Sequence, residues 1–176
     1  MRRALLTILP LSLLLAGPAV AGELREPIMD LLNAYEGAPT AAQLTALGDG
    51  VADELMDIAA DSDVASSRRG RAVSALGDFP SDDTLAFLSK QLGDTDASSI
   101  LRRKAAYALA AGWGEQAVKP LSDALSDSDV QLRIAAAGAL ADVSGDAAKG
   151  ALNARLEAED SDAAREAIEK ALGDKR

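Results

Sequence analysis

The chain repeats itself with a period of about 33 residues, and this periodicity limits the possible folds more than any other feature. Asp-x-Asp occurs four times, with each copy beginning 33 residues after the last, at Asp61, Asp94, Asp127 and Asp160. Ala-Leu followed by Gly or Ala also recurs, with leucine spacings of 29, 33, 31 and 32. Seven residues before the last four of these leucines stand Arg69, Arg102, Arg133 and Arg165. Three features in register indicate a tandem array of one small unit.

Each unit is predicted to hold two short helices. Apolar residues recur with a helical period, and no alternating strand pattern competes. The first helix should follow Asp-x-Asp, whose carboxylates suit a helix N-terminus, and the second should cover about 81–92, 116–125 and 147–156. Because such a pair cannot bury its own apolar face, pairs should stack. We expect an all-α, right-handed α–α superhelix (solenoid) of about four helix pairs, with an N-terminal capping helix and a C-terminal half repeat.

Three segments are expected along the chain. Residues 1–21 resemble a signal peptide, because Arg2 and Arg3 precede an apolar run that ends at a small-residue cleavage site. The run is too short and too proline-interrupted for a retained membrane anchor, the competing possibility. Cleavage near Ala21 predicts a periplasmic or secreted protein with no membrane span. Residues 22–39 are then the capping helix, and residues 40–176 are the repeat domain.

Composition excludes several kinds of chemistry. The sequence contains no His and no Cys, so it offers no imidazole base, no thiolate and no disulfide, and we expect no metal and no cofactor. After cleavage, 16 basic residues face 28 acidic ones, a net charge of −12. Nucleic acid is therefore an unsuitable partner, whereas a protein partner with a basic face is favoured.

The repeat resembles the HEAT-repeat superfamily, specifically the short HEAT-like repeats of phycocyanobilin lyases. Its best copy runs from Asp127 to Leu140, and the resemblance covers about 40–176. It implies a structural ladder in which each aspartate caps a helix and each arginine pairs with an aspartate of its own or an adjacent repeat. Its members would be Asp61, Asp94, Asp127, Asp160, Arg69, Arg102, Arg133 and Arg165. Thr40 departs from the pattern, since it stands where other copies have arginine. Calcium coordination by the loops and an anion site along the arginines are the alternatives.

Two functions remain open from the sequence. The first is a non-catalytic exported scaffold, not an enzyme, that binds a protein or peptide partner, chiefly on its second helices. Its candidate contact residues are Phe79, Phe87, Gln91, Trp113, Ser122, Lys149 and Asn153. The second is a chromophore- or small-molecule-handling protein related to the bilin lyases, which attach a pigment to a cysteine of another protein. Basic clusters at 68–71 and 102–104 also allow a patch for phosphate or an acidic partner, whereas the Glu157/Glu159 pair is interpreted as solubilising surface.

Overall fold

A computed structural model describes residues 23–33 and 38–173, and the regular elements of this part of the chain are helices joined by loops, without strands. The predicted signal peptide, residues 1–21, lies outside the described residues. Among those described, no helix is both long and apolar enough to cross a membrane.

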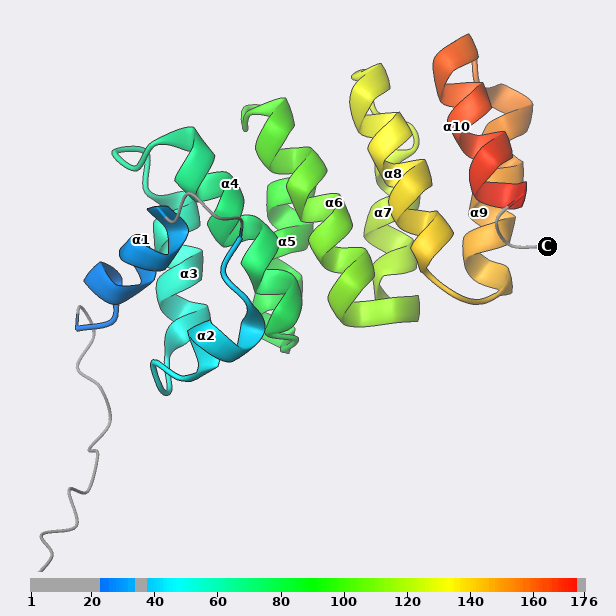
Figure 1. Ribbon diagram of the computed structural model, residues 1–176. Coiled ribbons are helices and arrows are strands. Elements are labelled where there is room, and N and C mark those ends of the chain that lie inside the picture. The colour runs from blue at the N-terminus through cyan, green and yellow to red at the C-terminus, as the bar shows by residue number, and fades with distance from the viewer. Residues whose placement is uncertain (1–22, 34–37, 174–176) are drawn as a thin grey trace, which may run out of the picture.

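The helices form two stacked layers (Figure 1). The layer of first helices contains α4 (Ser66–Ala75), α6 (Ser99–Trp113), α8 (Val130–Asp142) and α10 (Asp162–Gly173). The layer of second helices contains α3 (Val51–Ala60), α5 (Asp82–Gly93), α7 (Val118–Ala124) and α9 (Asp146–Ala158). The remaining elements are α1 (Arg25–Asn33), α2 (Ala41–Thr45) and the 3₁₀ turns η1 (Leu76–Asp78) and η2 (Gly114–Ala117).

The predicted all-α, right-handed solenoid is confirmed. Among the described residues, the pairs α4–α5, α6–α7 and α8–α9 follow one another, α2 and α3 precede them, and α10 is the half repeat at the C-terminal end. At the other end, α1 packs against α3 and α4.

Alanine and glycine bring the first helices close together. Ala105, Ala106 and Ala136 are completely buried between neighbouring first helices. The backbones of α6 and η1 approach closely at Gly112, where an added Cβ atom would lie 2.8 Å from the main-chain oxygen of Gly77. A larger residue at that point would push the two repeats apart, so these small residues set the spacing of the stack.

The N-terminal caps differ from the predicted pattern. Ser98 caps α6 and Asp129 caps α8, each by accepting a hydrogen bond from a main-chain N–H of the first turn. In three of the motifs, the side chain of the first aspartate instead accepts a hydrogen bond from the main-chain N–H two residues later. In the third motif, Asp127 Oδ1 accepts from the N–H of Asp129 at 2.8 Å. The expectation that Asp61, Asp94 and Asp127 cap helices is therefore wrong, because their carboxylates close the loop before the helix begins.

Candidate ligand cleft beside the arginine ladder

Three of the four repeated arginines connect consecutive helix pairs through main-chain oxygens. Each extends from a first helix to the C-terminal end of the preceding second helix, whose last carbonyls have no partner within the helix. The acceptors are Ala59 for Arg69, Leu92 for Arg102 and Leu156 for Arg165, at 2.9, 2.9 and 3.2 Å. A guanidinium at this position stabilises the helix end and fixes one repeat against the next.

Two arginines also pair with an aspartate of the following repeat. Arg102 forms an ion pair with Asp127, and Arg133 Nη2 lies 3.1 Å from Asp160 Oδ1. Burial disfavours the charged carboxylate of Asp127, but hydrogen bonds from Arg102 and from the main-chain N–H of Asp129 outweigh it and lower its pKa. The Asp127 carboxylate thus stays ionised beside Arg102.

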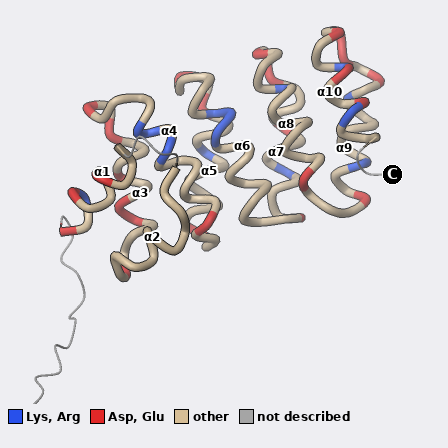
Figure 2. The backbone as a smooth tube through the Cα atoms, viewed as in Figure 1, with Lys and Arg blue, Asp and Glu red and all other residues tan. Residues whose placement is uncertain are grey.

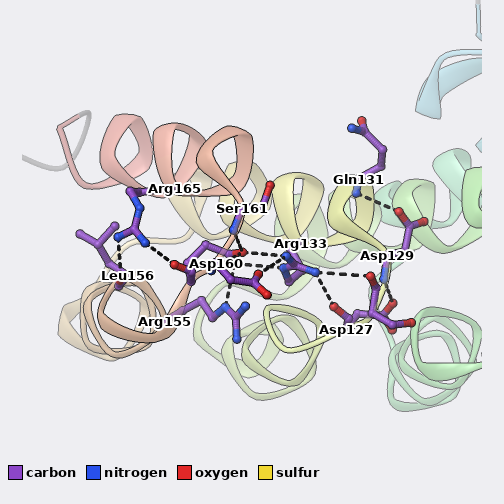
Figure 3. A network of polar contacts seen from close by, with 11 residues as sticks. Asp127, Asp129, Gln131, Arg133, Arg155, Leu156, Asp160, Ser161 and Arg165 are labelled. Atoms are coloured by element: carbon purple, nitrogen blue, oxygen red, sulfur yellow. Dashed lines mark hydrogen bonds and ion pairs between the residues drawn. The ribbon is translucent and has the colours of Figure 1, made fainter.

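The last repeat uses a different carboxylate from the one the motif predicts. The Glu159 side chain is 0% exposed, while that of Asp160 is 87% exposed. Glu159 Oε1 and Oε2 accept hydrogen bonds from Arg133 at 2.7 and 3.0 Å, and Oε2 accepts another from Arg155 Nε at 2.8 Å. Figure 3 shows Arg133 and Arg155 converging on this point. The interpretation of Glu159 as solubilising surface is wrong.

The environment of Glu159 strongly favours its ionised form. Hydrogen bonds from Arg133 have the largest effect and exceed the opposing effect of burial, while Arg155 and the main-chain N–H of Ser161 add to them. Together they hold the pKa of Glu159 far below its ordinary value of 4.5. Glu159 is the central carboxylate of the C-terminal part of the ladder.

Arg25 occupies the corresponding place at the N-terminal end. Thr40 leaves the first repeat without its arginine, but Arg25 on α1 pairs with Asp61 and, at 3.0 Å, with Glu54 Oε1. Sequence reasoning missed this residue because it lies outside the repeat register. A signal existed, since Arg25 is the only basic residue between positions 22 and 67.

Arg69 differs from the other ladder arginines of the central repeats. It forms no ion pair with any carboxylate in the described part of the chain, and its Nε donates to the main-chain oxygen of Ala59. Arg69 lines a cleft of about 340 Å³ between α3 and α5. The other residues that line this cleft are Ala60, Phe87, Lys90, Gln91, Asp94, Asp96 and Ala97. The structure thus places Arg69 and Asp94 at one cleft without joining them.

Two further clefts follow along the layer of second helices. The cleft between α5 and α7 measures about 480 Å³ and contains Lys119 and Arg102, the latter already paired with Asp127. The cleft between α7 and α9 measures about 250 Å³ and contains Arg155, which is bound to Glu159. Of these three clefts, the α3–α5 cleft is therefore lined by a ladder arginine, Arg69, that forms no ion pair with a described carboxylate.

The predicted contact residues are divided among several places. Phe87 and Gln91 line the α3–α5 cleft, and Ser122 lines the α7–α9 cleft. Lys149 and Asn153 are exposed on α9. Within residues 23–33 and 38–173, no three His, Cys, Asp or Glu side chains lie together so that they could hold a metal ion.

Trp113 and Phe79 do not form the expected binding edge. Trp113 is only 9% exposed, and its indole N–H donates to the main-chain oxygen of Ser81 at 3.3 Å. Phe79 is half-buried and packs against the core. Helix α6 continues through Trp113, which turns its side chain inward, so the expectation that Trp113 contacts a partner is wrong.

Comparison with known proteins identifies the repeat. Residues 94–173 match the family of HEAT repeats. The chain is also similar to a chain in the complex of CpcE and CpcF of phycocyanin lyase from Nostoc sp. PCC7120, with a TM-score of 0.61 and 20% sequence identity over 83% of this chain and 98% of that one. This likeness shows the shared fold. No curated protein sequence matches the chain significantly.

The likeness to a lyase corrects one expectation from the sequence. We expected a protein that is not an enzyme, because the chain lacks His, Cys and an evident acid–base pair. The matched chain belongs to a lyase complex, and this finding contradicts that expectation. A helical-repeat fold does not exclude participation in catalysis.

Proposed function

We propose that the chain, a HEAT-like repeat protein whose fold resembles that of a phycocyanin lyase chain, binds a carboxylate-bearing, bilin-like small molecule in the α3–α5 cleft and works with a protein partner. The observation that carries the proposal is Arg69, which lines this cleft and forms no ion pair with a described carboxylate. A guanidinium binds a carboxylate through two parallel hydrogen bonds, so an anionic group of a ligand suits this position.

Lys90 supplies a second cation to the same cleft. It lies in the last turn of α5, where its charge also interacts favourably with the helix dipole. Arg69 on α4 and Lys90 on α5 therefore approach the cleft from different helices. Such an arrangement suits a ligand that carries two acidic groups on flexible arms. The two propionate side chains of an open-chain tetrapyrrole are groups of this kind.

Apolar groups provide the surface for the body of the ligand. Phe87 is half-buried, and Ala60 and Ala97 line the cleft beside it. An aromatic ring next to small side chains favours stacking with a planar conjugated molecule. The cleft, at about 340 Å³, is at the lower end of the range for small-molecule sites, so it would hold one end of a bilin.

Two carboxylates make the cleft selective. Asp94 and Asp96 line it, and Asp94 Oδ1 accepts the main-chain N–H of Asp96 at 3.0 Å. Their negative charge repels a polyanion such as a nucleoside triphosphate. Their remaining oxygens can accept hydrogen bonds from the N–H groups of pyrrole rings. The mixture of cations, carboxylates and an aromatic ring therefore favours a bilin-like molecule over phosphate.

A protein partner and export complete the proposal. The structural neighbour is a complex of two proteins, and this supports an assembly with a second protein here as well. Residues 1–21 are proposed to direct the chain to the periplasm or the exterior, where it would meet both ligand and partner.

Titration with phycocyanobilin tests the small-molecule site. Binding to the full mature chain is followed by absorbance and by induced circular dichroism of the pigment. We expect saturable binding that Arg69→Gln and Lys90→Glu each weaken by about tenfold, since each removes a cation that faces the ligand.

The control is Lys149→Glu, which makes the same charge change as Lys90→Glu on an exposed lysine of α9. It should leave pigment binding unchanged. Thermal melts of all variants verify folding. Absence of saturable binding, or an equal effect of Lys149→Glu and Lys90→Glu, would contradict the proposed site.

A further inference from the structure

The layer of first helices exposes large apolar side chains on α6. Ile100 and Tyr107 are 54% and 48% exposed, and within the described part of the chain they are the large hydrophobic residues that face solvent. They are seven residues apart, so they lie two turns from each other on one face of the helix.

These side chains form part of a groove that crosses three helices. Between α6 and α8 the groove measures about 370 Å³ and is lined by Ile100, Tyr107 and Ile134 among others. Tyr107 and Ile134 also line its continuation between α8 and α10, which measures about 300 Å³. Gly138 leaves room for the Tyr107 ring beside α8, because a Cβ atom at position 138 would lie only 3.1 Å from the Tyr107 hydroxyl.

The charge of the α6–α8 groove is opposite to that of the protein. The whole sequence carries a net charge of −10, yet the residues that line this groove include Arg103 and Lys104 and, among those described, no carboxylate. Figure 2 shows basic positions along both α4 and α6. Lys104 lies toward α4, where its Nζ donates to Ser74 Oγ at 3.3 Å.

We infer that this groove, centred on Ile100, Tyr107 and Ile134, is a docking surface for an acidic amphipathic helix of a partner protein. The occupant follows from shape and charge. An amphipathic helix inserts apolar residues spaced three, four and seven positions apart into a groove between helices. Acidic residues beside that apolar stripe would face Arg103, with Lys104 adding positive charge at the α4 side of the groove, and this sets the sign of the partner's charge.

The inference does not depend on the proposed function. The groove lies on the layer of first helices, whereas the bilin-like ligand is assigned to the layer of second helices. Failure of pigment binding would leave the docking surface intact, and failure of docking would leave the pigment site intact.

The test uses a designed amphipathic helical peptide of about five turns, with leucines in one stripe and glutamates beside it. A control peptide keeps the leucines and replaces every glutamate with lysine. Fluorescence anisotropy with the mature chain should show saturable binding of the glutamate peptide, about tenfold tighter than that of the lysine peptide and weaker at high salt.

Variants locate the contact. Tyr107→Ser should weaken the glutamate peptide by about tenfold, because it removes an exposed anchor without opening the core. The double substitution Arg103→Glu and Lys104→Glu should reverse the preference between the two peptides. Lys119→Glu, at an 81% exposed side chain of α7 in the other layer, is the matched control and should change neither affinity.

Three results would overturn the inference. The first is absence of saturable binding of the glutamate peptide, and the second is equal affinity for both peptides. The third is a homodimer, detected by light scattering, that Tyr107→Ser dissociates, because the groove would then bind a second copy of this chain instead of an acidic partner.

Discussion

Substitution of Glu159 by Gln should destabilise the protein more than any change in the Asp-x-Asp motif next to it. Glu159 is completely buried and accepts hydrogen bonds from both Arg133 and Arg155. Removing its charge leaves the Arg133 side chain, only 6% exposed, without its closest counter-charge. Breaking a buried ion pair from one side costs about 3–5 kcal/mol.

Two features of the site place the expected cost near the lower limit. The glutamine retains one oxygen acceptor, and Arg133 keeps Asp160 at 3.1 Å as a second carboxylate. We therefore expect the free energy of unfolding to fall by about 3 kcal/mol. This loss is a large part of the free energy of unfolding of a typical domain, which is about 5–15 kcal/mol.

The assay is urea unfolding at neutral pH, followed by far-UV circular dichroism and by the fluorescence of Trp113, the single tryptophan of the chain. The matched control is Asp160→Asn, which makes the same carboxylate-to-amide change at an 87% exposed side chain. An exposed pair contributes about 0–1 kcal/mol, so the control should unfold close to the wild type. An equal or greater loss for Asp160→Asn would refute the assignment of Glu159 as the central carboxylate.

Three further predictions concern pH, packing and export. Because the folded-state pKa of Glu159 is lowered, its contribution to stability is complete above the ordinary value of 4.5 and is lost as the pH falls below it. The free energy of unfolding should therefore depend less steeply on pH in Glu159→Gln than in the wild type when both are titrated with acid. Identical slopes would contradict this. Gly112→Ala should cost about 1–3 kcal/mol in thermal or urea unfolding, since its Cβ would lie 2.8 Å from a main-chain oxygen of Gly77, and an unchanged stability would show that the repeats can separate freely. Expression of the whole sequence in a two-membrane bacterium should give a periplasmic protein that begins at Gly22 by mass spectrometry, whereas an uncleaved product in the cytoplasm would exclude the signal peptide.

The helical architecture could be predicted because its determinants lie within each repeat. The 33-residue register and the helical spacing of apolar residues are local, and they predicted the second helices to within a few residues of α5, α7 and α9. Alanine-rich first helices indicated close stacking, which the burial of Ala105 and Ala136 bears out. Such features do not depend on knowing which distant residues meet.

The polar contacts between repeats were harder to predict. Glu159 stands one residue before the motif, and its importance depends on Arg133, 26 residues away. Arg25 lies outside the register and reaches Asp61 across 36 residues. A repeat pattern assigns the same role to the same position in each copy, so it cannot identify a residue that replaces the expected one from elsewhere in the chain.

Aromatic residues were misplaced for a related reason. Trp113 is flanked by glycines, which predicted an exposed turn, but α6 extends through it and buries the indole against Ser81. Tyr107 lies among alanines on α6, and its side chain is 48% exposed where it lines the groove toward α8. Which side of an alanine-rich helix is covered depends on the neighbouring repeats and is weakly encoded in the helix itself.

The most direct test of the α3–α5 ligand site is a ¹H–¹⁵N NMR titration of the mature chain with phycocyanobilin. The account predicts that chemical-shift changes concentrate at Arg69 and at residues 87–97, around the cleft between α3 and α5. Residues around Lys149 on α9 should remain unaffected. Changes that instead centre on Tyr107 in the first-helix layer, or no changes at all, would contradict the account.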